Sequence, residues 1–498
     1  MRRAPELLPL LFSLLAGAAC APAAAAPTPA PVTAASAAPK AAANASIAPS
    51  PQADAPLRPL AEETRATLDQ LVAVDTSHGH ETDALEPIAQ RFRAAGLAGV
   101  ELLESAPGRG NLIARYKGNG SKKPLLLIAH VDVVPVEGQP WTVPPFRVTE
   151  KDGFLWGRGI NDDKAMAAVI VAIALELART KPALSRDVIF ALTAGEETGG
   201  IAGAKWLAQN HKDLVDAEIA LNELGSVRLS DDLENVVLVT TGVAEKTIQT
   251  YHLVAKGKGG HSSLPPVDSD PVLTLARALV KLEQHRFPAR ILPVTRDQFS
   301  GEATLSPKPL SDTLKRVGAA GRIAPDDERV LSKDTFYNAL TRTTCVATQL
   351  QGAPQDNVLP TTAEANVNCR LLPDETREQL LETLKKIVGD PAVEITPKAD
   401  YGYGPYSPPE GVVPAAVKRI AARTWPGVPV VGAMGTGATD SRHLRAIGVA
   451  AYGVSVSPIS KKESTSGHGA HGPDERRPTK WLADGARYLR DLTLELAK

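Results

Sequence analysis

The sequence predicts an α/β protein with a mostly parallel central sheet and a smaller α+β domain inserted into it. From about Leu57 to Val243, apolar runs alternate with helical patterns, as they do in βαβ units. From about Lys246 the strand patterns alternate polar and apolar residues, which is typical of half-exposed antiparallel strands. After about Asp400 the first pattern returns, so the chain is expected to leave one domain and re-enter it.

The chain has 498 residues, so more than one domain is expected. We divide it into a signal peptide (1–26), an Ala/Pro-rich tether (27–56), the first part of the large domain (57–245), the inserted domain (246–398) and the second part of the large domain (399–498). The tether contains almost no charged residue and cannot bury a core, so it is left out of the fold.

The N-terminus has the features of an export signal. Arg2 and Arg3 precede a short apolar stretch from Leu7 to Ala19, which is too short to span a bilayer and is followed by small residues. We therefore expect an exported protein, periplasmic or secreted, without a transmembrane segment. A lipid anchor on Cys20 and an uncleaved tail are the alternatives.

The composition argues against nucleic-acid and membrane-surface partners. A net charge of -1 gives no electrostatic basis for binding either polyanion, and an aromatic content of 4% weakens the case for a base-stacking platform. The hydrophobic content of 43% and the charged content of 22% are normal for a soluble globular protein.

The large domain begins with strands and helices in alternation. "PLAEETRATLDQLVAV" has helical periodicity, and "KPLLLIAHVDVVP" and "RDVIFALTAGEE" are continuous apolar runs of the kind found in strands buried on both faces. "DDKAMAAVIVAIALELART" predicts a long buried helix between these two strands. "GGIAGAKWLAQN" predicts a further helix, and "AEIALNELG" a short strand.

The inserted domain is predicted from mixed elements. The strand "KTIQTYHLVAKGKG" precedes the helix "DPVLTLARALVKLEQHR", and a loop-rich segment is expected to about Lys333. The strands "TRTTCVATQL" and "TAEANVNCRLL" follow, and then the helix "DETREQLLETLKKIVG". A hairpin centred near Asn357 would bring Cys345 and Cys369 face to face, as a disulfide or as two buried thiols.

The large domain then resumes with two helices around a strand. The segments are "PAAVKRIAARTW", "GVAAYGVSV" and the closing "TKWLADGARYLRDLTLEL".

Ionisable residues gather where the predicted strands of the large domain end. His130 and Asp132 are two residues apart, so both side chains are expected on the same face, at the edge where open α/β sheets bind ligands. The adjacent acids Glu196 and Glu197 end the next buried strand, and Glu223 ends a third. Adjacent acids at a buried strand end repel each other, so they need a cation or exposure to water.

Two further segments supply candidates of the same chemistry. Asp162 and Asp163 follow a Gly-rich turn at the start of the long helix, where ordinary helix capping is the alternative. His468 and His471 lie in a Gly-rich loop near the C-terminus. Carboxylate and imidazole ligands in this number suit two zinc ions about 3.5–4 Å apart.

These motifs together resemble a known family. "HVDVVP", "GRGINDDK", "GEETGG", "GGHSS", "NVLP" and "TDSRH" with "HGPDE" are similar to the co-catalytic di-zinc hydrolases, which comprise aminoacylases, acetylornithine and succinyl-diaminopimelate deacylases, and carboxypeptidases. The resemblance extends from about Leu57 to the end of the chain. "NALTRTTCVATQL" and "TDSRHLR" look most like the carboxypeptidase S branch, which also holds secreted N-acyl-amino-acid hydrolases.

The resemblance implies a zinc-peptidase-like catalytic domain with an inserted lid and dimerisation domain. It implies that Asp162 bridges two zinc ions, that one zinc is completed by His130 and Glu223, and that the other is completed by Glu197 and His471. Cobalt or manganese could replace zinc at such ligands. His468 is a rival to His471, but "HGPDE" is the form found in the family.

The resemblance also implies catalytic and binding roles. Asp132 would orient His130, and Glu196 would be the general base. His261 would reach the active site of the partner in a homodimer and stabilise the oxyanion. Asn357 and Arg370 would hold the substrate's carboxylate, although from the sequence alone Arg370 could equally be a solvent-facing strand residue.

We therefore expect an exported zinc metallopeptidase or amidohydrolase that cleaves a peptide or N-acyl amide bond next to a free carboxylate. A non-catalytic metal- or peptide-binding protein on the same fold is the alternative. Ala165, Gly195 and Leu224 depart from the family pattern without removing a ligand. Leu224 stands where glycine is usual and could alter the pocket, so the acyl-side preference is left open.

Overall fold

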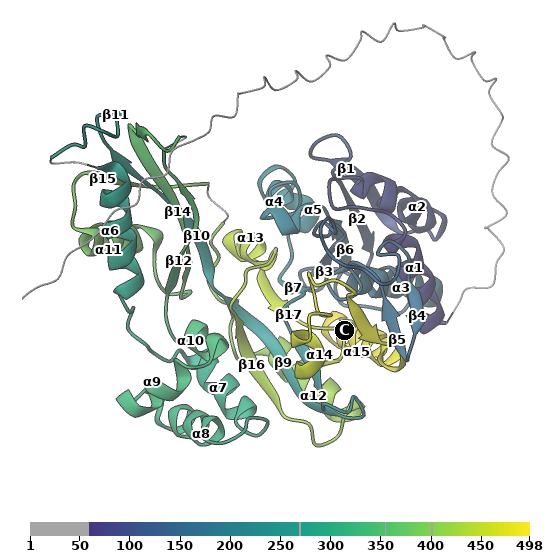
Figure 1. Cartoon of the computed structure of the whole chain (residues 1–498). Helices are drawn as coiled ribbons and strands as arrows, with labels where there is room; N and C mark the ends of the chain where they lie inside the picture. The colour runs from purple at the N-terminus through teal and green to yellow at the C-terminus, as the bar shows by residue number, and fades with distance from the viewer. Residues whose placement is uncertain (1–58, 268–269, 354, 400–401) are drawn as a thin grey trace, which may run out of the picture. The chain divides into compact units, whose positions relative to one another are not determined.

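The computed structural model describes residues 59–267, 270–353, 355–399 and 402–498 (Figure 1). The predicted signal peptide, the tether and Cys20 lie outside the described residues. Among the helices of the described ranges, none combines the length and the apolar character needed to cross a bilayer.

The largest sheet of the described residues has a parallel centre with antiparallel pairs on both sides. In spatial order its strands are β1 (Ala98–Glu104), β2 (Gly110–Tyr116), β6 (Val188–Thr193), β3 (Leu125–His130), β7 (Ile219–Asn222), β17 (Ala450–Gly453), β9 (Val236–Glu245), β8 (Ser226–Leu229) and β18 (Ile459–Ser460), with β16 (Val430–Gly435) beside β9. The neighbours from β6 to β17 run parallel, as do β16 with β9 and β18 with β8. The predicted α/β class with a mostly parallel central sheet is confirmed.

Strand β3 is buried on both faces, as its continuous apolar run predicts. Leu125 and Leu127 belong to one hydrophobic cluster, and Leu126 and Ile128 belong to another on the opposite face. Successive side chains of a strand point to opposite faces, so a strand between two layers of helices must be apolar at every position.

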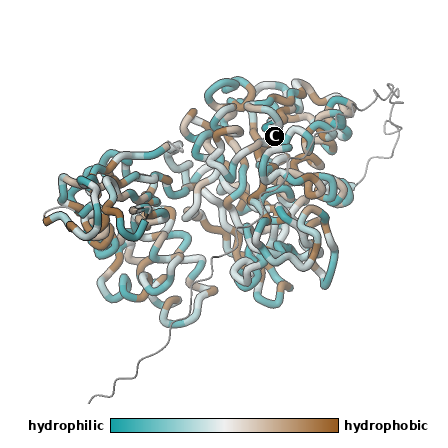
Figure 2. Tube along the Cα trace, turned by 45° about the horizontal axis from the view of Figure 1, so that its top comes forward, coloured by the Kyte–Doolittle hydropathy of each residue, from teal (hydrophilic) through white to brown (hydrophobic). Residues whose placement is uncertain are grey.

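Helices cover both faces of this sheet. One cluster draws on α1 (Leu60–Val72), α2 (Glu81–Ala94), α3 (Lys164–Thr180), α12 (Val412–Thr424) and α15 (Leu482–Ala497). The other draws on α4 (Ala204–Asn210), α5 (Lys212–Val215) and α13 (Ser441–Ala446). Hydrophilic (teal) and hydrophobic (brown) residues alternate along much of the Cα trace (Figure 2), as expected where elements bury only one side.

A second, antiparallel sheet lies between residues 247 and 397. Its order is β12 (Thr344–Gln351), β14 (Thr362–Leu371), β10 (Thr247–Lys256) and β15 (Val393–Pro397). Helices α6 (Pro271–Gln284) and α11 (Arg377–Val388) pack against it and share a separate hydrophobic cluster with it. The short strands β11 (Gly260–His261) and β13 (Val358–Leu359) pair with each other.

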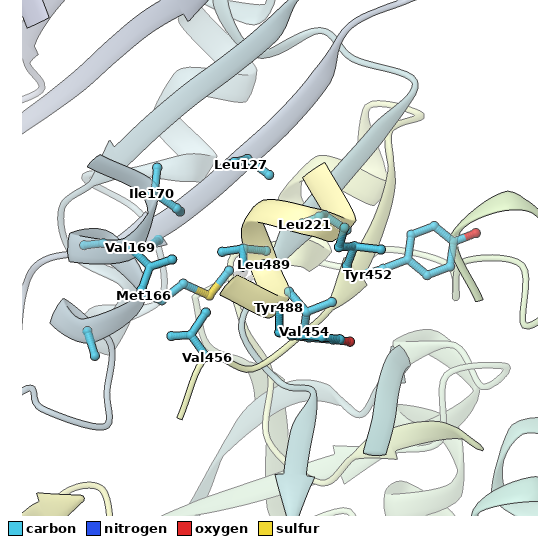
Figure 3. Close-up of a cluster of buried hydrophobic side chains, with 14 of the residues drawn as sticks. Leu127, Met166, Val169, Ile170, Leu221, Tyr452, Val454, Val456, Tyr488 and Leu489 are labelled. Carbon is cyan, nitrogen blue, oxygen red and sulfur yellow. The ribbon is translucent and has the colours of Figure 1, made fainter. Parts of the chain in front are cut away.

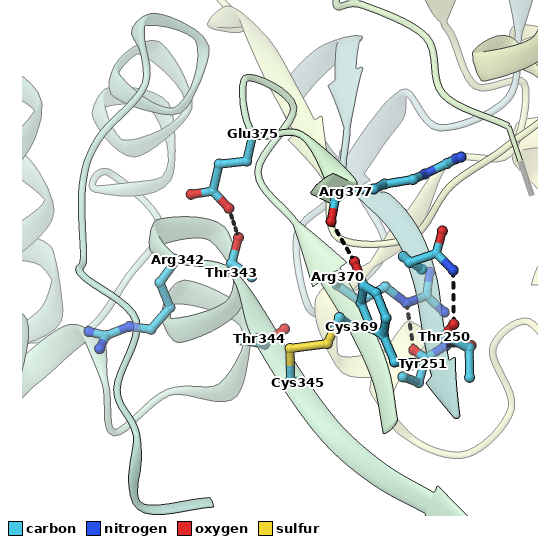
Figure 4. The surroundings of a disulfide bond; sticks show 12 residues. Thr250, Tyr251, Arg342, Thr343, Thr344, Cys345, Cys369, Arg370, Glu375 and Arg377 are labelled. Carbon is cyan, nitrogen blue, oxygen red and sulfur yellow. Dashed lines mark hydrogen bonds between the residues drawn. A yellow bond between two sulfur atoms is a disulfide. The ribbon is translucent and has the colours of Figure 1, made fainter. Parts of the chain in front are cut away.

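Cys345 and Cys369 lie opposite each other on β12 and β14 and are joined as a disulfide (Figure 4). Of the two states that the sequence left open, the structure has the cross-link. It ties the outer strand β12 to the middle of the sheet.

The prediction of a loop-rich segment up to about Lys333 is wrong. The segment forms α7 (Pro293–Glu302), α8 (Leu310–Ala320) and α9 (Pro325–Leu331), and α10 (Thr335–Thr341) follows. Prolines usually suggest loops, but here they occupy the first turn of α7 and of α9. A backbone N–H at that position has no hydrogen-bond partner inside the helix, so its absence in proline loses no hydrogen bond. Although this segment lies within 246–398, α7 packs on β16 and β9, and its apolar residues join the core of the large sheet.

A small sheet brings two distant loops together. It consists of β4 (Thr149–Lys151), β5 (Phe154–Trp156) and β19 (Arg476–Pro478), with β5 in the middle. The loop that follows β5 and the loop that precedes β19 are therefore each attached to one of two paired strands. A short helix, α14 (Lys461–Thr465), precedes the second loop.

Candidate metal centre

Three parallel strands deliver acids and a histidine to one edge of the large sheet. His130 is the last residue of β3, Glu196 and Glu197 lie in the 3-10 turn after β6, and Glu223 directly follows β7. Strands β6, β3 and β7 are parallel neighbours, so their carboxyl ends meet at the same edge. Open α/β sheets bind ligands at that edge.

Glu475 ties together the two loops that carry Asp162 and His471. The carboxylate of Glu475 accepts hydrogen bonds from Arg158 Nη1 (2.8 Å) and from the backbone N–H groups of Gly159 (3.1 Å) and Asn161 (2.6 Å). Burial raises the pKa of Glu475 to about 7. The sequence analysis gave this residue no role, although its position inside "HGPDE" was a usable signal.

The two carboxylate oxygens of Asp162 face two different histidines. Oδ1 lies 2.9 Å from His130 Nε2, and Oδ2 lies 3.2 Å from His471 Nε2. A carboxylate oriented in this way can bridge two cations, one beside each histidine.

Each histidine has a second carboxylate within reach. Glu223 Oε1 lies 3.8 Å from His130 Nε2, and Glu197 Oε1 lies 3.0 Å from His471 Nε2. Asp162 thus belongs to two groups of candidate ligand atoms, and within each group all atoms lie within 4.8 Å of one another. Atoms that share one zinc at about 2.0–2.2 Å each must lie within about 4.4 Å of each other, and the four separations given above are smaller than that.

The electrostatics of the cluster fit a pair of divalent cations. Burial raises the pKa of Glu223 well above its ordinary value, and the charge of Asp162 adds to the rise. Hydrogen bonds with Asp162 and Glu197 raise the pKa of His471 to about 10. Without a cation, the negative charge of these acids is offset by protons. These protons are bound either to the acids themselves or to the neighbouring histidines. Imidazole nitrogens and carboxylate oxygens are also ligands that zinc accepts.

Asp132 supports both sides of the cluster from just beyond β3. Its backbone carbonyl lies 3.0 Å from His130 Nδ1, and its carboxylate Oδ1 lies 3.4 Å from the same nitrogen. The same carboxylate accepts hydrogen bonds from the backbone N–H groups of Glu196 (3.0 Å) and Glu197 (3.1 Å). The strand ends at His130, so Asp132 reaches this position from a loop rather than from the strand predicted for it.

Asp132, Asp163 and Glu196 adjoin the two groups, and four further candidate residues lie apart from them. His468 Nδ1 lies 3.3 Å from the carbonyl oxygen of Pro473, and its ring packs edge-on against Trp156. The others lie in β11, directly before β13 and in the second sheet, and none of them makes a hydrogen bond or ion pair to the cluster within the described residues; they are His261, Asn357 and Arg370.

A second row of buried charges lies behind the cluster. Burial raises the pKa of Asp440 to about 6, and its Oδ2 accepts a hydrogen bond from Thr193 Oγ1 (3.0 Å). Arg442 is 4% exposed, and its charge acts on both Asp440 and Glu196. The sequence analysis used "TDSRH" only as a family signature, so it gave neither residue a role.

The comparison with protein families decides which family this fold and site belong to. The model of Peptidase family M20/M25/M40 matches residues 126–495. The chain belongs to this family. The resemblance inferred from the motifs is therefore confirmed, and the protein is an M20-family hydrolase of the peptidase and amidohydrolase kind.

Several relatives have similar sequences. N-fatty-acyl-amino acid synthase/hydrolase PM20D1 of Xenopus tropicalis is 30% identical over 353 residues, which cover 70% of this chain and 68% of that protein. PM20D1 of Mus musculus is 27% identical over 418 residues, which cover 80% and 81%. Probable carboxypeptidase S-like 2 of Dictyostelium discoideum is 31% identical over 297 residues, which cover 57% and 55%. These relatives confirm the branch that the motifs indicated.

Solved structures share the fold at lower sequence identity. The M20 family metallo-carboxypeptidase Sso-CP2 from Sulfolobus solfataricus aligns with a TM-score of 0.65 and 19% identity, over 87% of this chain and 99% of that one. Bacillus subtilis YXEP, described as a dinuclear metal binding peptidase from the M20 family, aligns with a TM-score of 0.56 and 16% identity, over 88% and 99%.

Proposed function

We propose that the protein is an exported di-zinc hydrolase that cleaves a peptide or N-acyl amide bond next to a free carboxylate. The observation that carries the proposal is the orientation of Asp162, whose two oxygens face His130 and His471 at 2.9 Å and 3.2 Å. His130 and Glu223 would hold one cation and Glu197 and His471 the other, with Asp162 between them.

Glu196 is the general base in this proposal. Two bound divalent cations would supply Lewis acidity and a water acidic enough to act as a nucleophile near neutral pH. Glu196 would hold the proton released by the attacking water and deliver it to the leaving amine. Asp132 fixes the backbone of Glu196 and the ring of His130 at the same time, so base and ligand keep a constant spacing.

The second sheet would recognise the leaving amino acid. Arg370 on β14 and Asn357 before β13 would hold its carboxylate, Arg370 through a fork-shaped pair of donors. The Arg370 side chain is half-buried and directs Nε to Asn368 Oδ1 at 3.3 Å. In a homodimer, His261 would stabilise the oxyanion in the partner's site.

Exposed apolar residues support dimerisation through the inserted region. Val346 and Leu350 on the outer strand β12 are 61% and 68% exposed, and Val272, Leu273 and Val280 on α6 are also exposed. An outer strand with free backbone groups and apolar side chains is suited to pairing with another chain.

Export is supported by two features. The N-terminal sequence resembles a signal peptide, and the Cys345–Cys369 disulfide suits an oxidising compartment. The relatives named N-fatty-acyl-amino acid hydrolase and carboxypeptidase support the choice of an amide bond next to a carboxylate.

The test is hydrolysis of dipeptides and N-acyl amino acids by the zinc-loaded mature protein and by its Glu196→Gln variant. We expect the variant to lose about 10²–10⁴-fold in kcat while it keeps two metal ions per chain. The matched control is Glu234→Gln, at a side chain that is 66% exposed, and it should retain full activity. A wild-type protein that binds two metals and cleaves no member of the panel would overturn the proposal.

A further inference from the structure

A cavity of about 200 Å³ opens beside the candidate metal centre. Carboxylates of the centre form part of its lining, and Met166, Val454 and Val456 form its main apolar part. Leu224, the residue after the candidate ligand Glu223, also lines it. The cavity thus places a few apolar side chains next to the atoms that would carry out the reaction.

The apolar lining is part of the rigid core of the large domain. Met166 on α3 is 2% exposed, and Val454 and Val456, which follow β17, are 1% and 2% exposed. All three pack in the hydrophobic cluster around α3 and α15 (Figure 3). A close-packed core does not expand to admit a larger group, so the size of the cavity is preformed.

Leu224 holds its place in an uncommon backbone conformation. Its φ is 84°, in the left-handed region that favours glycine and is an outlier for a bulky residue. Its side chain lies against Gly435, where a Cβ would come within 2.5 Å of Leu224 Cδ2. The absence of a side chain at Gly435 therefore makes room for Leu224. A strained residue next to a candidate ligand motivates a functional hypothesis.

The position of the cavity indicates which end of the substrate it receives. Its lining comes from residues 161–166, 223–225, 454–457 and 470, all of them outside the second sheet. The proposed function places the leaving amino acid at Arg370, on β14 of that sheet. The group on the other side of the scissile carbonyl is therefore the one that faces the cavity.

The volume and charge of the cavity limit this group. The cavity volume of about 200 Å³ is below the about 300–1,000 Å³ of sites that enclose drug-sized ligands. A short aliphatic chain fits inside the cavity, whereas a long fatty chain would extend beyond it. The lining, which lies wholly within the described residues, contains no Lys, Arg or His, so a second carboxylate on the acyl group would have no basic partner.

We propose that this cavity binds the acyl side of the substrate and selects a short, uncharged aliphatic group, with Leu224 as the specificity-determining residue. The proposal rests on the proposed function and narrows its substrate class. It separates this protein from the relatives named for N-fatty-acyl substrates, and also from a deacylase for succinylated substrates.

The first experiment compares kcat/KM of the zinc-loaded protein for acetyl-, hexanoyl-, decanoyl-, octadecanoyl- and succinyl-phenylalanine. We expect the hexanoyl compound to exceed the octadecanoyl and succinyl compounds by at least about tenfold, the lower end of what one ill-fitting methylene costs in an apolar pocket. A preference for the octadecanoyl or the succinyl compound would overturn the proposal.

Two variants should move the chain-length optimum in opposite directions. Leu224→Gly, which suits the positive φ, enlarges the cavity and should raise the decanoyl-to-hexanoyl ratio about tenfold. Ser457→Leu fills the cavity from another segment and should move the optimum to acetyl. The control Leu221→Ala removes a buried leucine that does not line the cavity, so it should lower stability without changing the preference. Identical profiles in all four proteins would refute the role of Leu224.

A binding series separates this proposal from the proposed function. Calorimetry would compare hexanoyl and octadecanoyl hydroxamates on the same metal-loaded proteins. If no acyl amino acid is cleaved, the proposed function fails. The binding series still tests whether the cavity binds a short acyl chain more tightly than a long one. Tighter binding of the hexanoyl compound, with that preference reduced in Leu224→Gly, supports the cavity assignment. Equal ratios in the wild type and the variant contradict it.

Discussion

The large sheet and the second sheet present their candidate functional residues in different surroundings. At the edge of the large sheet, acids and histidines lie within 2.9–3.8 Å of one another. Around the second sheet, His261 and Asn357 are exposed, and Arg370 is half-buried. His130 is 1% exposed and Glu197 is 11% exposed, so these two need partners for their polar groups, whereas exposed charges are stable in water alone. The proposed chemistry of the first region therefore rests on contacts between the residues themselves, whereas that of the second region rests only on analogy.

The largest effect should come from Asp162, the residue shared by both halves of the centre. Asp162→Asn removes one anionic oxygen from the pair that faces His130 and His471, so neither cation keeps its full ligand set. We expect loss of both metal equivalents and a loss of activity beyond the about 10²–10⁴-fold expected for removal of the base. Elemental analysis and kinetics provide the measurement.

Asp163→Asn is the matched control for this substitution. Asp163 is adjacent and buried, but it belongs to neither group of candidate ligands. The control should retain two metals per chain. Equal metal loss in both variants would show that the acidity of the turn, and not the bridging position, holds the cations.

The second prediction concerns the cross-link of the second sheet. The double variant Cys345→Ser, Cys369→Ser opens a loop with a sequence separation of 24, which should cost about 3 kcal/mol of stability. We expect a lower denaturation midpoint by circular dichroism and unchanged metal content. Loss of metal in this variant would break the distinction between the two regions, because it would couple the cluster to the second sheet.

The third prediction tests the residue that joins the two loops of the centre. Glu475→Gln leaves Arg158 buried without a charged partner and weakens the acceptor for the Gly159 and Asn161 N–H groups. Removal of such a supporting group commonly costs about 10–100-fold in metal affinity, which a chelator competition would measure. Glu234→Gln, at an acid whose side chain is 66% exposed, should retain full affinity. Equal affinities of all three proteins would contradict the role of Glu475.

The smallest effect is expected at Arg370. Arg370→Lys keeps the charge but loses the fork-shaped donor pair, so KM for carboxylate substrates should rise about tenfold, or about 1.4 kcal/mol. For substrates that end in a carboxamide instead of a carboxylate, KM should be nearly the same in the wild type and in Arg370→Lys. The surface substitution Arg277→Lys on α6 controls for the general effect of the exchange. An unchanged KM would leave Arg370 as an ordinary strand residue.

The sequence predicts those parts of the fold in which every position has the same environment. Strand β3 is apolar from Leu125 to Ala129 and helix α3 is apolar from Ala165 to Leu175, because all these residues are buried. Helices α7 and α9 are not predicted, because their first-turn prolines look like loop signals and their packing against the large sheet involves distant residues. Local patterns do not contain that information.

For the site, the sequence predicts the candidate ligands but not the residues that support them. His130, Asp162, Glu197, Glu223 and His471 follow from strand ends and motifs, and their roles stay predictions. Glu475 and Asp440 are acids in polar segments, and such acids look solvent-exposed until the fold buries them. The cavity beside Leu224 requires three segments far apart in the chain, so no local pattern indicates it.

The distribution of the candidate ligands along the chain has a consequence for biosynthesis. His130, Asp162, Glu197 and Glu223 are synthesised well before His471, whose loop is held by Glu475 and docks through β19. A nascent chain that has not reached this loop contains one half of the centre and part of the other. If these residues hold the two cations as proposed, the centre is complete only after the C-terminal segment has docked.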